Sequence, residues 1–100
     1  MDPDANETLT LTLPTEAGLL RLTRLVTRSF LRQNGATLGE ARQNAGKVER
    51  RCVALVRGAR AGRRTLTLSL VRTGTACEVR AAVGPARPGR LLFKCVAKDR

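Results

Sequence analysis

The chain of 100 residues has the length of one domain, and its apolar content of 42% is enough for a modest core. Nineteen lysines and arginines oppose eight acids, which gives a net charge of +11, and histidine is absent. This composition excludes Ser-His and Cys-His catalysis and most zinc sites, and it favours polyanionic partners: nucleic acid, anionic lipid or an acidic protein.

The three cysteines follow no zinc or redox spacing, and no apolar run approaches the roughly 18 residues that a membrane span needs. We therefore expect free thiols in a reducing compartment, no membrane span and a cytoplasmic protein.

The charge is unevenly distributed along the chain. Residues 1–16 contain four acids and no base, so residues 17–100 carry nineteen bases against four acids, a net charge of +15. Sixteen of the bases are arginine, which contacts phosphate or carboxylate groups through a planar, two-point geometry. The composition of a GC-rich genome is the alternative source of this arginine excess.

The first predicted element is a strand. Residues 1–6 are polar and acidic, and we expect them to be disordered. In the following "ETLTLTLPTE", three leucines alternate with three threonines, and this period of two predicts a half-buried strand that Pro14 ends.

Residues 15–35 change to a helical period, with Thr15 as the expected N-cap and "NG" as the expected end. The apolar residues that recur on one face, and that we expect to be buried, are Leu19, Leu22, Val26 and Phe30. The basic residues of the same stretch form a single stripe: Arg21, Arg24, Arg28 and Arg32. The stripe is either an ordinary solvated helix face or an edge that binds phosphate or carboxylate, and the absence of acids among its members favours binding.

The next elements are a second helix and a hairpin. "TLGE" at residues 37–40 is a capping box, and the pattern that follows predicts a helix up to the break "GARAG" at residues 58–62. "RRTLTLSLVRTG" and "ACEVRAAV" then alternate with period two around Gly74, which predicts two paired strands. The final "RLLFKCVAKDR" fits a short helix or a strand equally well.

This order of elements predicts an α+β domain over residues 7–100. The order is strand, helix, helix, strand, strand, then a short helix or strand. We expect a two-layer sandwich, in which a small, mostly antiparallel sheet is covered on one face by the two helices. Exposed edges of that sheet would allow a homodimer.

Four features occur in a recognisable order: a strand followed by "LP", a helix rich in Leu and Arg, a capped helix reading "AGKVERRCVALVRGA", and a hairpin. With this order, residues 9–83 resemble the anti-sigma regulatory factor type of serine kinase. That type belongs to the GHKL ATPase superfamily, which includes gyrase and the histidine kinases. The resemblance implies a bacterial transcription regulator whose partner is a sigma factor or a STAS-type antagonist.

The resemblance also implies that the nucleotide site has degenerated. Glu49 falls at the family's catalytic Glu, but Val53 stands where the family has its Mg²⁺-binding Asn, and Arg57 stands where it has a His. The family's adenine-binding Asp is replaced by Ala81 or Ala82. Without a hard oxygen ligand for Mg²⁺, phosphoryl transfer is disabled, so we expect a non-enzyme with no metal and no cofactor. Glu49 is then a partner for a base on its own helix; the candidates are Arg42, Arg50 and Arg57.

Two functions follow from these observations. The first is a non-catalytic module that binds an acidic protein partner through an arginine-rich face. The alternative is sequence-independent DNA or RNA binding through the same surface, although two Phe and no Trp or Tyr offer little for base stacking. The residues expected to form this surface are Arg21, Arg24, Arg28, Arg32, Arg50, Arg51, Arg57, Arg60, Arg63 and Arg64.

Overall fold

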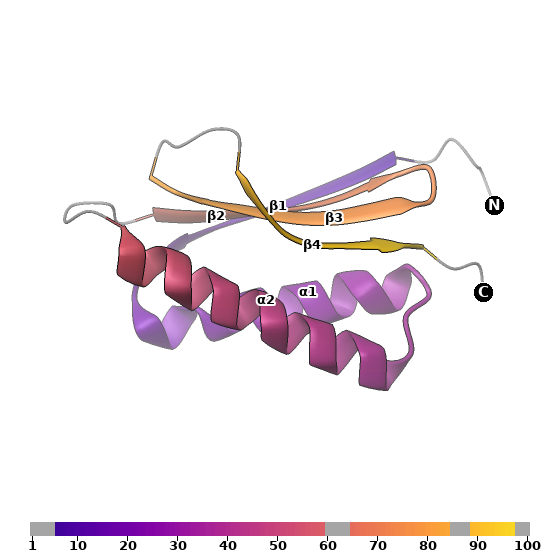
Figure 1. The fold of residues 1–100 in the computed structure, drawn as a ribbon, viewed down its shortest axis with the longest axis horizontal. Coiled ribbons are helices and arrows are strands. Elements are labelled where there is room, and N and C mark those ends of the chain that lie inside the picture. The colour runs from indigo at the N-terminus through magenta and orange to yellow at the C-terminus, as the bar shows by residue number, and fades with distance from the viewer. Residues whose placement is uncertain (1–5, 60–64, 85–88, 98–100) are drawn as a thin grey trace.

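A computed structural model describes residues 6–59, 65–84 and 89–97, which form two layers (Figure 1). The strands are β1 (Asn6–Pro14), β2 (Thr65–Thr73), β3 (Ala76–Val83) and β4 (Arg90–Val96). The helices are α1 (Arg21–Gln33) and α2 (Leu38–Gly58), and a short 3-10 turn, η1 (Ala17–Leu19), precedes α1. The predicted α+β sandwich is confirmed, and the last described element is a strand.

The strands form one antiparallel sheet in the order β1-β2-β3-β4. The helices lie together on one of its faces, with α1 in contact with β2, and α2 in contact with β3 and β4 (Figure 1). β1 includes Asn6, one residue before the predicted start of the domain, because the Gly74 N–H donates to the Asn6 side-chain oxygen (3.3 Å) and holds that end of the strand against the β2–β3 turn. Residues 1–5 lie outside the described part of the chain.

The core lies between the sheet and the helices. The alternating pattern in β2 predicts that its leucines face the core, and Leu66, Leu68 and Leu70 are fully buried. From the helix side they meet Phe30 and Val48, which are also buried. Alternation in β2 therefore located its buried face correctly. In α2 the apolar residues that step by three and four are buried from Ala41 to Cys52, but Leu38, at the start of the same pattern, is 46% exposed.

The buried face of α1 differs from the predicted one. Leu19, Leu22 and Val26 are only half-buried, whereas Thr23 and Thr27 are completely buried. α1 also starts at Arg21, after η1, with no side-chain cap, so Thr15 is not its N-cap. The reason is that α1 packs against both the sheet and α2. The side of α1 that points between these two neighbours is buried, and it carries threonines, so the hydrophobic pattern did not identify it.

The turn between the helices is fixed by local hydrogen bonds. α1 ends in a Schellman arrangement, in which the Ala36 N–H donates to Leu31 O (3.0 Å) and the Gly35 N–H to Arg32 O (3.2 Å). Gly35 has φ of 95°, which L side chains rarely adopt. The capping box predicted for α2 is present. Among the described residues, neither helix is long and apolar enough to cross a membrane.

Candidate functional site

An open hollow of about 670 Å³ lies between α1 and α2, and we call it the helix-pair hollow. The described residues that line it all belong to these two helices: Arg24, Gly46, Glu49, Arg50, Val53, Ala54 and Arg57. Three guanidinium groups and one carboxylate therefore surround a floor made of small apolar residues. A surface of this composition attracts anions and also accepts an apolar group.

The spacing along α2 explains how these residues gather. Gly46, Arg50, Val53 and Arg57 are separated by four, three and four residues, so they follow one helix face over three turns. A Cβ on Gly46 would meet the Arg50 Nη1 at 3.5 Å, an ordinary van der Waals distance, so the Arg50 guanidinium lies close to the glycine at the rim of the hollow.

Glu49 pairs across the helices with Arg24, whose Nε lies 3.5 Å from Glu49 Oε1. The predicted partners were bases of its own helix. Arg24 was missed because it is 25 residues earlier in the chain, and no local spacing links the two. The side chains are 52% and 25% exposed, so the pair contributes only about 0.2–1 kcal/mol to stability.

The three residues assigned to the degenerate nucleotide site, Glu49, Val53 and Arg57, all line the helix-pair hollow. Val53 also packs against the core cluster. The two candidate adenine positions, Ala81 and Ala82, are in β3 and do not line this hollow. The structure therefore places Glu49, Val53 and Arg57 beside Arg24 and Arg50 in the helix-pair hollow, whereas Ala81 is buried in the core cluster on β3.

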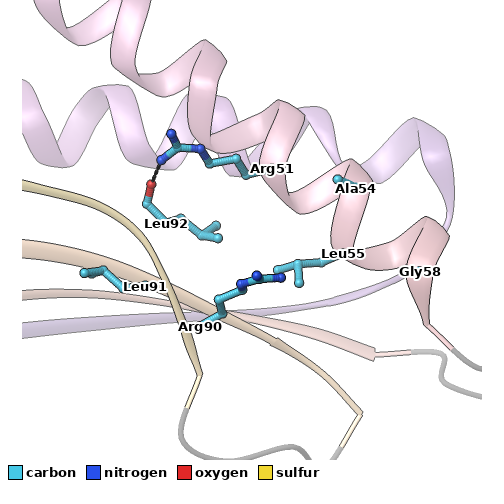
Figure 2. Close-up of a pocket in the computed structure, with 7 residues that line it drawn as sticks. All are labelled: Arg51, Ala54, Leu55, Gly58, Arg90, Leu91 and Leu92. Atoms are coloured by element: carbon cyan, nitrogen blue, oxygen red, sulfur yellow. Dashed lines mark hydrogen bonds between the residues drawn. The ribbon is translucent and has the colours of Figure 1, made fainter.

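A second hollow, of about 430 Å³, lies between the C-terminal half of α2 and β4. Arg51 points toward this side, and its Nη1 donates to the Leu92 backbone oxygen of β4 (Figure 2). Arg90 extends from β4 into the same hollow, with Leu55, Leu91 and Leu92 around it. Arg51 thus connects α2 to β4. It lies on a different side of α2 from Arg50, the preceding residue, which lines the helix-pair hollow.

The remaining predicted arginines fall into two groups. Arg21, Arg28 and Arg32 lie on α1 and do not line the helix-pair hollow, and Arg32 Nη1 donates to Ala36 O (3.1 Å) at the end of the helix. Arg60, Arg63 and Arg64 lie outside the described residues. Of the predicted surface, Arg24, Arg50 and Arg57 therefore lie together around the helix-pair hollow.

The thiols lie within the fold. Burial raises the pKa of Cys52 to about 11, with Glu49 adding to the rise, although a hydrogen bond with Thr23 lowers it. Burial, followed by the neighbouring Cys95, raises the pKa of Cys77 to about 11. Little thiolate is therefore present at these two positions at neutral pH. In the described ranges, no three Cys, Asp or Glu side chains are close enough together to hold a metal ion.

Comparison with protein-family models finds none that matches this chain, and comparison with curated proteins finds no significant relative.

Proposed function

We propose that this protein is a non-catalytic regulatory module that binds an acidic protein partner in the helix-pair hollow. The observation that carries the proposal is the position of Arg24, Arg50 and Arg57 around a small apolar floor. An amphipathic helix of a partner, with carboxylates beside an apolar ridge, matches this groove in both charge and polarity. Arginines that lose water in such a contact contribute much of the binding energy.

The non-catalytic part of the proposal is supported by the surroundings of Glu49. Its carboxylate contacts the Arg24 guanidinium, and the side chain one turn further along α2, at Val53, is apolar. A general base needs a carboxylate that is available to its substrate, and Mg²⁺ needs oxygen ligands. The resemblance to anti-sigma factors adds the expected class of partner, a sigma factor or a STAS-like regulator in the bacterial cytoplasm.

Nucleic-acid binding is the second candidate, and the arginine stripe of α1 favours it. Arg21, Arg28 and Arg32 join Arg24 there, and no acid lies among them within α1. The two aromatic side chains do not assist, because Phe30 is buried and Phe93 is partly buried against the core. Such binding would rest on phosphate contacts alone, would be sequence-independent and would weaken steeply with salt.

A fluorescence-anisotropy titration separates the two candidates. One probe is a labelled helical peptide with Leu at i, i+3, i+4 and i+7 and Glu at the flanking positions. The second is the same peptide with its residue order scrambled, and the third is a labelled random-sequence duplex. The variants are Arg50→Glu, inside the hollow, and Lys47→Glu, which is exposed on the same helix, does not line the hollow and changes the net charge equally.

The proposed function predicts that the ordered peptide binds more tightly than the scrambled one, and that Arg50→Glu weakens it at least about tenfold while Lys47→Glu has little effect. Equal binding of both peptides, or equal losses in both variants, would show that only the overall charge matters. In that case, tight and salt-sensitive binding of the duplex would make nucleic acid the better interpretation.

A further inference from the structure

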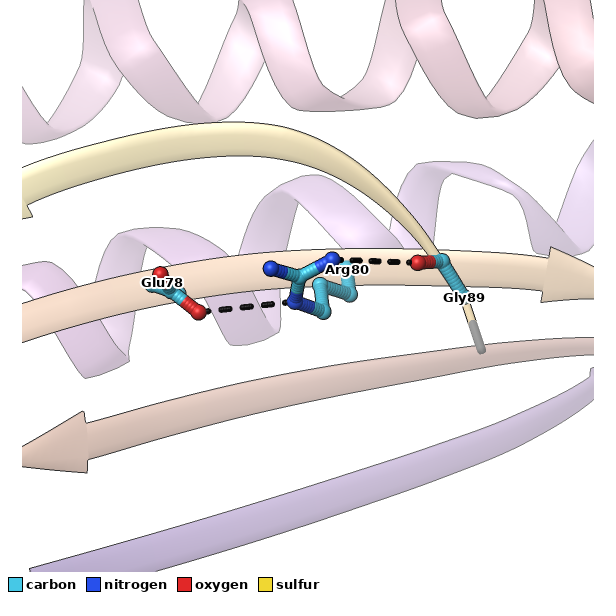
Figure 3. Close-up of polar contacts among 3 residues, drawn as sticks. All are labelled: Glu78, Arg80 and Gly89. Carbon is cyan, nitrogen blue, oxygen red and sulfur yellow. Dashed lines mark hydrogen bonds and ion pairs between the residues drawn. The ribbon is translucent and has the colours of Figure 1, made fainter. Parts of the chain in front are cut away.

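The two edges of the sheet are built differently. At the β4 edge, the pairing with β3 shifts between Val79 and Arg80, and the strand carries Arg90 and Lys94. Arg80 holds this irregular end: its Nη1 donates to Gly89 O (3.2 Å) and its Nε lies 3.4 Å from Glu78 Oε2 (Figure 3). A bulge and basic residues are the usual devices that keep an edge strand from pairing with another chain.

The β1 edge has none of these devices. All nine residues of β1 pair with β2 in one unbroken register, from Asn6 opposite Thr73 to Pro14 opposite Thr65. The strand contains no Lys or Arg, and its proline is the last residue. A long, regular, unprotected edge offers its backbone groups to another strand.

The pairing pattern shows which backbone groups of β1 are offered. The Gly84 N–H donates to Thr65 O (2.8 Å), so the backbone groups of Thr65 point toward β3. Because hydrogen-bonded pairs alternate along antiparallel strands, every second residue of β2 after Thr65 also bonds to β3. The intervening residues of β2 therefore bond to β1, opposite Leu9, Leu11 and Leu13. The N–H and C=O groups that point away from the sheet consequently belong to Thr8, Thr10 and Thr12.

The described surface beside this edge also carries no base. α1 faces α2 on one side, where Arg24 meets Glu49, and its other side lies toward β1, because α2 covers β3 and β4. That other side carries Leu22, Val26, Ser29 and Gln33. Leu9 on β1 is 39% exposed, which is unusual for a leucine on the helix-facing side of a sheet.

We propose that the β1 edge is a homodimer interface, in which β1 of a second copy pairs antiparallel with β1 about a two-fold axis at Thr10. This register uses the whole strand and forms about eight backbone hydrogen bonds, because the outward groups of Thr8 meet those of Thr12 in the second copy. Leu9 then lies opposite Leu11 of the second copy, in the closer type of cross-strand pair. The two sheets become one sheet of eight strands, with the helices of both copies on the same face.

Charge favours a second copy as the occupant. The chain carries +11, so two copies repel each other wherever their arginines meet. The β1 edge and the adjoining side of α1 form a surface without a base. A strand with this composition pairs with itself without opposing like charges. This interface does not involve the helix-pair hollow, so its test is independent of the proposed function.

The test is light scattering after size-exclusion chromatography, combined with hydrogen exchange measured by NMR on the full chain. At high micromolar concentration we expect a mass of about twice the 10.8 kDa chain. Thr10→Pro removes an N–H that bonds nothing within its own sheet, so the fold tolerates it, but dimerisation should weaken at least about 100-fold. Val96→Pro is the matched control on the β4 edge, where the side chain is 70% exposed and the N–H also points outward.

Hydrogen exchange adds a readout that a loss of folding cannot imitate. The amides of Thr8, Thr10 and Thr12 should exchange slowly at high concentration and quickly on dilution, whereas those of Leu9 and Leu11 stay protected by β2 throughout. A monomeric wild type at about 1 mM would overturn the proposal. So would equal dissociation by both proline variants, or a dimer whose threonine amides still exchange quickly.

Discussion

Thr27 offers a direct test of the packing of α1. Its side chain is fully buried, and its hydroxyl has no hydrogen-bond partner within the described structure. A buried, unpartnered hydroxyl costs about 1–3 kcal/mol, and valine has nearly the same shape without the polar atom. Thr27→Val should therefore raise the free energy of unfolding by about 1 kcal/mol, which corresponds to a Tm increase of about 4–8 °C in a domain of this size.

Thr23→Val is the matched variant. Thr23 is equally buried on the same helix, but its hydroxyl donates to Leu20 O at 2.6 Å. Losing that bond should lower stability by about 1 kcal/mol. Urea unfolding followed by circular dichroism measures both variants, with the m-value as a check that unfolding stays two-state. If Thr27→Val destabilises the protein as much as Thr23→Val does, the Thr27 hydroxyl has a partner and the reasoning fails.

Three further predictions concern the helix turn, the thiols and the hollow. Gly35→Ala should lower the free energy of unfolding by about 1 kcal/mol or more, because Gly35 has a φ of 95°. At Gly39 an added Cβ meets nothing within 4 Å, so Gly39→Ala should instead raise it by about 0.5–1 kcal/mol. Equal effects of the two variants in thermal melts would contradict this. The pKa of both Cys52 and Cys77 is raised from 9.0 to about 11 in the folded state, so their contribution to stability is complete below pH 9 and is lost as the pH rises toward 11. Urea midpoints that stay constant from pH 8 to 11 would refute that. Among the described residues, Glu49 is the only acid that lines the helix-pair hollow. Glu49→Gln should therefore tighten binding of the ordered acidic peptide a few-fold in the anisotropy assay and change Tm little. Weaker binding would mean that the carboxylate positions the site.

Where the sequence predicted the fold well, local interactions were sufficient. The period of two in β2 and β3 identified their buried residues, and the capping box located the start of α2. Both patterns result from backbone geometry that acts over a few residues, so they can be read along the chain.

The sequence was less informative where an element contacts two others. Hydrophobicity favoured Leu22 and Val26 as the buried face of α1, yet the contact with both α2 and the sheet buried Thr23 and Thr27. The sequence of residues 90–96 also fitted either a helix or a strand. These residues form β4 because they pair with the edge of β3, a contact that the local sequence does not reveal.

By itself, the sequence determined the α+β class, the alternating core and the excess of arginine, since each is a property of composition or of short-range periodicity. Only the tertiary structure decided that Arg24 meets Glu49 and that Arg51 and Arg50 lie on different sides of α2. It also decided that one sheet edge is irregular and basic while the other is regular and carries no base. These features depend on residues that are distant in the chain, and only packing of the helices on the sheet sets the distances between them.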